Sequence, residues 1–189
     1  MRWTHGPYVL EVIDEPTFTF GSADNVRGYA VELRLEPDGE PTVVRGVTCT
    51  EDGVVRGSVV VGARGGGVGI DPRTVACVAD RCVVAVGDRV AALRLPELAL
   101  LWHANADEVV CFGVLAAPDG RHVIAFGELS VACFGLDGVR TWTFGARDVL
   151  RGDPVLDGGT LEVEDVGGTR YRIDLATGRG RRVPGRMGG

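Results

Sequence analysis

Short apolar or alternating runs, each ended by a tight turn, follow one another along the chain. Runs of this kind occupy residues 8–12, 17–20, 30–35, 43–50 and 54–61. Alternation over a few residues predicts β-strands, and the 29 glycines supply the positive φ angles that tight turns need. No segment keeps the apolar period of an α-helix over several turns. We therefore expect an all-β fold with helix in less than about a tenth of the residues.

The C-terminal two-thirds of the chain repeats itself with a constant period. The spacing from Gly87 to Trp102 equals the spacing from Gly127 to Trp142, and the second pair follows the first by one period. Each copy reads as a strand, a turn at glycine and an acidic residue, a second strand, another turn, and a strand ending in tryptophan. The repeat predicts two equivalent structural units.

A third copy follows, with one departure from the pattern. Ile173 and Leu175 lie two periods beyond Leu93 and Leu95, but Arg182 stands at the offset of the tryptophan. A period of about 40 residues with about four short strands per unit is typical of β-propeller blades. We expect a small or partial propeller with about three recognisable blades.

Parts of these copies resemble the quinoprotein-type repeats, which are named for pyrroloquinoline quinone. Residues 174–178 (Asp-Leu-Ala-Thr-Gly) match the aspartate and threonine-glycine portion of that repeat, and residues 95–102 and 136–142 match its turn-to-tryptophan portion. The resemblance covers about residues 73–183. It implies that Trp102 and Trp142 pack between neighbouring blades.

The number of blades departs from that family. Quinoprotein enzymes that hold the cofactor use six to eight blades, so three repeats predict a protein without it. Residues 1–72 form a divergent blade or a flanking sheet, unless a second chain completes the assembly. We expect residues 1–72 and 73–183 to make one structural domain, with 184–189 as a disordered tail.

Composition excludes several kinds of chemistry. All 20 basic residues are arginine, so no Schiff-base or phosphate-loop lysine exists in this chain. The formal charge of −6 argues against a general role on nucleic acid or anionic membranes. There is no secretory signal pattern and no apolar segment of about 20 residues, which predicts a cytoplasmic protein.

The five cysteines lie in apolar runs, and their spacing contains no C-x-x-C motif. They are Cys49, Cys77, Cys82, Cys111 and Cys133. An odd number without metal-type spacing argues against both a disulfide framework and a zinc site. We expect buried free thiols and no bound metal.

Two histidines offer an alternative function. His103 precedes Asp107, Glu108 and Cys111, but these spacings match no common metal-ligand set. His122 falls on one face of a predicted strand. A small-molecule-binding or hydrolytic protein with its site near His103, His122 and the acidic loop residues is therefore the alternative prediction.

The first prediction for function rests on charged residues in the connections. Connections between blades gather on one face of a propeller, where they form a rim that binds other macromolecules. The predicted rim consists of Arg64, from the glycine-rich loop at 62–69, together with Asp107, Glu108, Arg147 and Asp148. We expect a non-enzymatic domain that binds a protein partner. A toxin-neutralising, immunity-type role is one sub-case by analogy.

Overall fold

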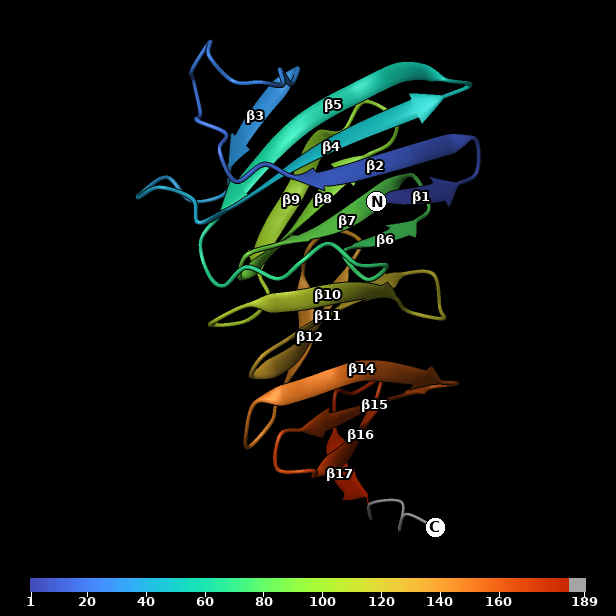
Figure 1. Cartoon of the computed structure of the whole chain (residues 1–189). Coiled ribbons are helices and arrows are strands. Elements are labelled where there is room, and N and C mark those ends of the chain that lie inside the picture. The colour runs from blue at the N-terminus through green and yellow to red at the C-terminus, as the bar shows by residue number, and fades with distance from the viewer. Residues whose placement is uncertain (184–189) are drawn as a thin grey trace.

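Four β-sheets stacked face to face form the protein (Figure 1). The computed structural model describes residues 1–183, and among them there is no helix. The N-terminal sheet lies at one end of the stack, and three four-stranded sheets follow it in chain order. We call these three sheets the first, second and third blades. The prediction of an all-β fold with propeller-like repeats is confirmed. The predicted tail at 184–189 lies outside the described residues.

The N-terminal sheet is a four-stranded antiparallel meander with a fifth strand at one edge. The meander contains β1 (Arg2–His5), β2 (Tyr8–Asp14), β4 (Val43–Glu51) and β5 (Val54–Ala63), and β3 (Val31–Arg34) pairs in parallel with β5. Residues 15–42 are thus an insertion between the second and third strands of the meander. Apart from this insertion the four antiparallel strands pair in chain order, as the strands of a blade do.

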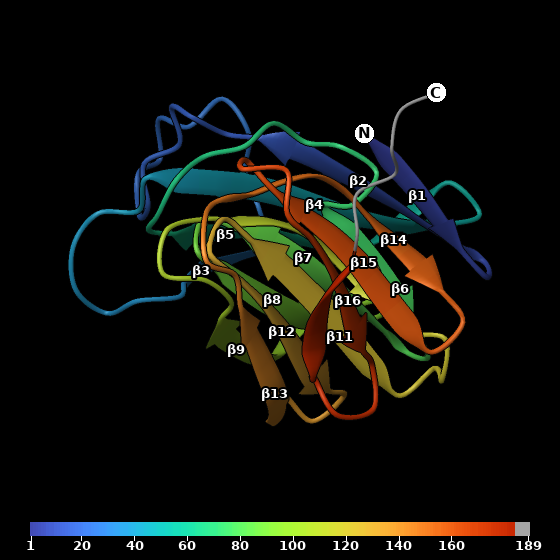
Figure 2. The ribbon, with the colours of Figure 1, turned by 90° about the horizontal axis from the view of Figure 1, so that it is seen from below.

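Each repeat forms one blade whose strands pair in chain order. The first blade contains β6 (Val75–Val78), β7 (Arg81–Val86), β8 (Arg89–Arg94) and β9 (Ala99–Asn105). The second contains β10 (Cys111–Ala116), β11 (His122–Gly127), β12 (Ser130–Gly135) and β13 (Arg140–Gly145). The third contains β14 (Leu150–Asp157), β15 (Thr160–Asp165), β16 (Arg170–Asp174) and β17 (Gly180–Val183). Figure 2, which looks along the stack from below, shows the sheets lying over one another.

The predicted strand at 17–20 is wrong, because these residues form turns and irregular chain. Phe18 packs edge to face against Phe20 and against Tyr29, with ring centroids 5.4 and 5.8 Å away. A Cβ atom on Gly46 would lie 1.8 Å from the Tyr29 hydroxyl oxygen, so this cluster presses on the outer face of β4. The alternating aromatic residues Phe18 and Phe20 therefore cover the outer face of the N-terminal sheet and do not form one of its strands.

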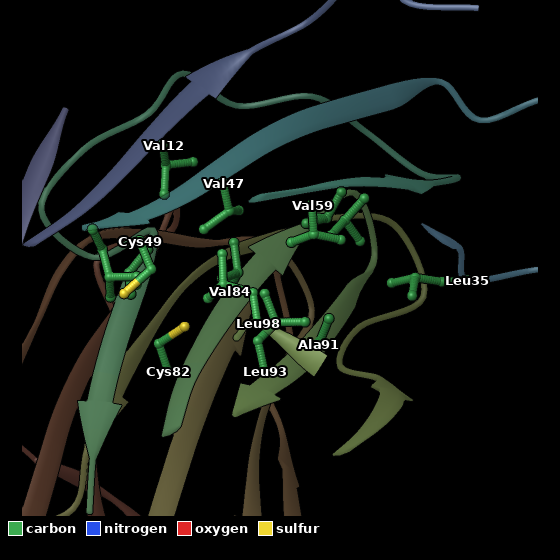
Figure 3. Packing of buried hydrophobic residues seen from close by; sticks show 14 of the residues in the cluster. Val12, Leu35, Val47, Cys49, Val59, Cys82, Val84, Ala91, Leu93 and Leu98 are labelled. Atoms are coloured by element: carbon green, nitrogen blue, oxygen red, sulfur yellow. The ribbon is translucent and has the colours of Figure 1, made fainter. Parts of the chain in front are cut away.

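The inner strands of the two middle sheets are buried on both faces. Nearly every residue of β7, β8, β11 and β12 is buried. The first blade packs on the N-terminal sheet through residues such as Leu93 and Val47, as Figure 3 shows, and on the second blade through Val83 and Phe134. The second blade packs on the third through Ile124 and its neighbours. Three apolar layers therefore hold the four sheets together.

The repeated tryptophans join each blade to the next. The indole N–H of Trp102 donates to the carbonyl oxygen of Leu136 at 2.8 Å, and that of Trp142 donates to Leu175 at 2.9 Å. Each indole lies flat over a glycine turn: a Cβ atom on Gly138 or Gly178 would come within 2.6 Å of the indole Cγ. Both glycines stand at the same offset after their tryptophans, and each is the surface on which its tryptophan docks.

A buried arginine joins the N-terminal sheet to the first blade. Arg45 of β4 is 1% exposed, and its guanidinium donates to the carbonyl oxygens of Ala85 at 2.6 Å and Val68 at 2.7 Å. Its Nε lies 3.5 Å from a carboxylate oxygen of Asp14. Burial lowers the pKa of Arg45, and the Asp14 charge opposes that shift. The cation is retained because two carbonyls and a carboxylate replace its water.

The stack ends in a charged face on the third blade. Glu162 pairs with Arg170 and Arg172, and Arg151 pairs with Glu164 at 2.5 Å, all on the side away from the second blade. Arg182 stands on the same sheet, at the position from which a tryptophan would dock on a further blade. A polar outer face is the property of a terminal repeat. The described sheets therefore form an open arc with a polar last face.

The predicted free thiols are confirmed. All five cysteines are free; four are buried and Cys77 is partly exposed. Burial raises the pKa of Cys77 to about 11 and that of Cys111 to about 12. These thiols are protonated at neutral pH, so they serve as small apolar side chains.

The docking of tryptophan on glycine can be tested with two matched glycine substitutions. Gly138 and Gly120 both have positive φ, at 85° and 65°, but a Cβ on Gly120 meets nothing within 4 Å. Gly120→Ala should cost about 1 kcal/mol of unfolding free energy through backbone strain alone. Gly138→Ala should cost about 2 kcal/mol more, because the methyl group pushes Trp102 away. Urea titration measures both, and equal losses would contradict the docking.

Candidate functional site

The connections between consecutive sheets all lie at one end of the stack, on the left in Figure 1. The hairpin turns between the second and third strands of each blade lie at the same end. We call this surface the connection face. It comprises residues 64–66, 87–89, 105–110, 127–130, 146–150 and 165–169.

Backbone hydrogen bonds run from one connection to the next across this face. The amide groups of Gly66, Glu128, Leu150 and Val166 donate to the carbonyls of Val109, Val110, Glu128 and Val149, respectively, over 2.7–3.1 Å. Each bond links two different sheets or the loops that join them. The connection face is therefore continuous from the glycine-rich loop to the third blade.

The glycine-rich loop packs closely on the first and second blades. A Cβ atom on Gly65 would lie 2.6 Å from the backbone nitrogen of Asp88 and 2.8 Å from the carbonyl oxygen of Val109. The φ angle of Gly65 is 98°, which a larger residue rarely adopts. Only glycine allows the loop to pass this close to the backbone of Asp88 and Val109. The loop thereby holds Arg64 beside the two blades.

Asp107 has a structural position on this face. It is 2% exposed, and its Oδ1 accepts the amides of Val109 and Val110 at 2.9 and 3.3 Å. Its Oδ2 accepts the amides of Leu129 and Ser130 at 2.9 Å each, and the Ser130 hydroxyl at 3.0 Å. This carboxylate joins the connection to the β11–β12 turn. The Asp107 side chain is therefore not exposed to a partner. The prediction that Asp107 lies on an exposed rim is wrong for this residue.

The other four predicted rim residues are exposed. They are Arg64, Glu108, Arg147 and Asp148. Within residues 1–183 no carboxylate lies within ion-pair distance of Arg64 or Arg147. Both guanidinium groups are therefore available to another molecule. Whether they bind one stays a prediction.

Partly buried charges lie at the β7–β8 turn, where the amide of Asp88 donates to the carbonyl oxygen of Arg64 at 2.9 Å. Glu36 and Arg89 form an ion pair at 2.5 Å. Burial, followed by the Glu36 charge, raises the pKa of Asp88, while Arg89 and Arg64 oppose the rise. Burial and the Arg89 charge lower the pKa of His103, which lies exposed on β9 nearby. This part of the face combines both signs of charge.

The structure separates the two histidines of the alternative prediction. His103 is near the connection face, because its neighbour Asn105 pairs with Arg89 at the β7–β8 turn. His122 begins β11 at the opposite end of the stack, where its Nδ1 lies 2.6 Å from Oδ2 of Asp119. No single site contains both.

A cavity of about 680 Å³ lies beside His122, between the second and third blades. Apolar groups including Ile124 and Trp142 make most of its wall, and its polar side chains are Asp119, His122, Thr141 and Asp174. Sequence reasoning missed the two aspartates, because they follow different strands on different blades. The aspartate within the 174–178 motif was the one available signal.

Within residues 1–183 no three His, Cys, Asp or Glu side chains are grouped so that they could hold a metal ion. No helix in that part of the chain is long and apolar enough to cross a membrane.

Comparison with known proteins shows the fold. No family model matches the chain, and no curated protein matches it. BamB from Moraxella catarrhalis is similar in structure over 95% of this chain, with a TM-score of 0.55 and 14% identity. The Pan2 WD40 domain of Neurospora crassa is similar over 60%, with a TM-score of 0.50 and 16% identity. The chain spans 62% of the first protein and 38% of the second. The chain therefore has the fold of β-propeller repeats.

The role of Asp107 can be tested against its neighbour Glu108. Asp107→Ala leaves four backbone amides and a hydroxyl without their acceptor, so it should cost about 3 kcal/mol or more of unfolding free energy. Glu108→Ala removes an exposed carboxylate and should change stability by less than about 0.5 kcal/mol. A denaturant titration of both variants checks this, and a loss for Asp107→Ala as small as that for Glu108→Ala would refute the assignment.

Proposed function

We propose that this chain is a non-enzymatic interaction domain that binds a protein partner through its connection face. The observation that carries the proposal is the pair of exposed arginines, Arg64 and Arg147, which have no ion-pair partner within residues 1–183. They are fixed on one continuous, hydrogen-bonded surface. Arginines on a rigid surface are frequent anchors of protein interfaces.

The charges of the face favour a partner with both signs of charge. Glu108 and Asp148 are exposed beside the arginines, one on each of two successive connections. Val109, which is 39% exposed, adds an apolar contact between them. Such alternation determines partner choice and association rate more than affinity. A phosphate backbone would instead require a mainly basic face.

The chemistry of the face also supports binding over catalysis. Cys111 lies below the face, but it is 1% exposed and burial raises its pKa to about 12, so it is a poor nucleophile. The hydrogen-bonded pair of His122 and Asp119 lies at the opposite end of the stack. We assign no reaction to the connection face.

The repeat type is part of the same proposal. We assign the blades to the quinoprotein-type repeats without the cofactor. The docking of Trp102 on Gly138 and of Trp142 on Gly178 supports this assignment, because the resemblance implies tryptophans packed between blades.

The proposal predicts loss of partner binding on charge reversal. A partner captured from an extract of the source cells should bind the Arg64→Glu, Arg147→Glu double variant at least tenfold more weakly. The control is the Arg56→Glu, Arg94→Glu double variant, which changes the charge equally at exposed positions on the opposite end of the stack. It should bind normally. Urea titration must show that both variants fold, and unchanged affinity in the first would reject this face.

A further inference from the structure

The two interfaces between blades follow one plan, which allows them to be compared position by position. Trp102 donates to Leu136 across the first interface, and Trp142 donates to Leu175 across the second. The residues two places before these carbonyls are Phe134 and Ile173. The residues that begin the second strand of each blade are Arg81 and His122.

At the first interface, large side chains fill the space beside the tryptophan. Phe134 is 1% exposed and stacks on Trp102, with ring centroids 5.9 Å apart. The Arg81 guanidinium crosses from the first blade and donates to the Leu136 carbonyl at 2.6 Å. Arg140 lies over Phe134, 5.3 Å from its centroid. An aromatic ring and a guanidinium thus close this interface.

At the second interface, smaller side chains stand at the same two positions. Ile173 replaces the phenyl ring of Phe134, and His122 replaces Arg81. Strand alternation points His122 toward the third blade, with Ile124 and Phe126, as it points Arg81 toward the second. The imidazole of His122 bonds to Asp119 on its own blade at 2.6 Å. The cavity of about 680 Å³ lies at this interface, beside His122 and Trp142.

The wall of this cavity is complementary to a cation with an apolar stem. Asp119 and Asp174 supply two carboxylates, and no lysine or arginine of the described chain lines it. Oδ1 of Asp174 accepts both bonds from Thr177. The Asp174 side chain is exposed, so its carboxylate is open to a further donor. Trp142 offers an aromatic surface and Ile124 an apolar one.

We propose that the cavity binds an arginine side chain of a partner polypeptide. The guanidinium takes the place that Arg81 fills at the preceding interface, and it donates to the carboxylate of Asp174 and the carbonyl of Leu175. A planar guanidinium can donate two parallel hydrogen bonds to one carboxylate, and the face of the guanidinium can stack on an indole ring. The methylene stem lies along Ile124. This site is separate from the connection face and goes beyond the function proposed there.

Capped peptides test the recognition of the guanidinium. The probes are acetyl-Gly-Arg-Gly-amide and its citrulline counterpart, which keeps the shape and removes the charge. Titrated into ¹⁵N-labelled protein, the arginine peptide should shift the indole N–H of Trp142 and the amides of Gly159 and Ala176 saturably. The citrulline peptide should bind at least tenfold more weakly, and so should the arginine peptide to Asp174→Asn.

A substitution that rebuilds the first interface supplies the second test. His122→Arg places a guanidinium where Arg81 has one, so the variant should abolish binding of the arginine peptide without lowering the urea midpoint. His103→Arg adds the same charge at an exposed position on the first blade and should leave the binding unchanged.

The outcomes separate this proposal from the preceding one. Equal binding of the citrulline peptide, shifts confined to residues away from the cavity, or peptide binding by His122→Arg would each overturn the arginine site. The Arg64→Glu, Arg147→Glu variant should still bind the peptide, because those residues lie at the other end of the stack. Failure of either proposal therefore leaves the other standing.

Discussion

The structure depends on one constraint: the inner strands of the first and second blades are apolar on both faces, so each blade has to be covered on both sides. Alternation within a strand normally leaves one face polar. Here β7, β8, β11 and β12 bury nearly every residue, and neither middle blade could lie at an end of the stack. The N-terminal sheet covers one side and the third blade covers the other. The aromatic insertion of the N-terminal sheet and the ion pairs of the third blade then face the solvent.

The same constraint explains why the two blade interfaces differ. Apolar layers hold the sheets together, and tryptophan on glycine sets their spacing at both interfaces. The side chains beside each tryptophan are then free to vary. Arg81 and Phe134 close the first interface, whereas a cavity lies beside His122 and Trp142 at the second. A repeated scaffold can thus hold a binding site at one interface while the packing that defines the fold stays the same.

Binding and stability are assigned to different residues of the connection face. Both carboxylate oxygens of Asp107 accept hydrogen bonds from backbone amides, which joins the 105–110 connection to the β11–β12 turn. Backbone hydrogen bonds join the loops of Arg64 and Arg147 to these same segments, through Gly66 and Leu150. Their backbone therefore has less freedom to lose on binding. The cavity for which we propose arginine binding lies at the other end of the stack. The molecule therefore offers two surfaces, and neither depends on the other.

The sequence by itself determined the all-β fold, the blade repeat and the free thiols, because strand alternation, turn glycines and cysteine spacing are local properties. It also determined the missing tryptophan at position 182, which distinguishes the third blade from the other two. Only the tertiary structure decided that Asp107 is buried, that His103 and His122 lie far apart, and that a cavity adjoins Trp142. These facts depend on which side chains meet across sheets. Residues far apart in the chain become neighbours or remain separate according to how the blades stack, and no local pattern carries that information.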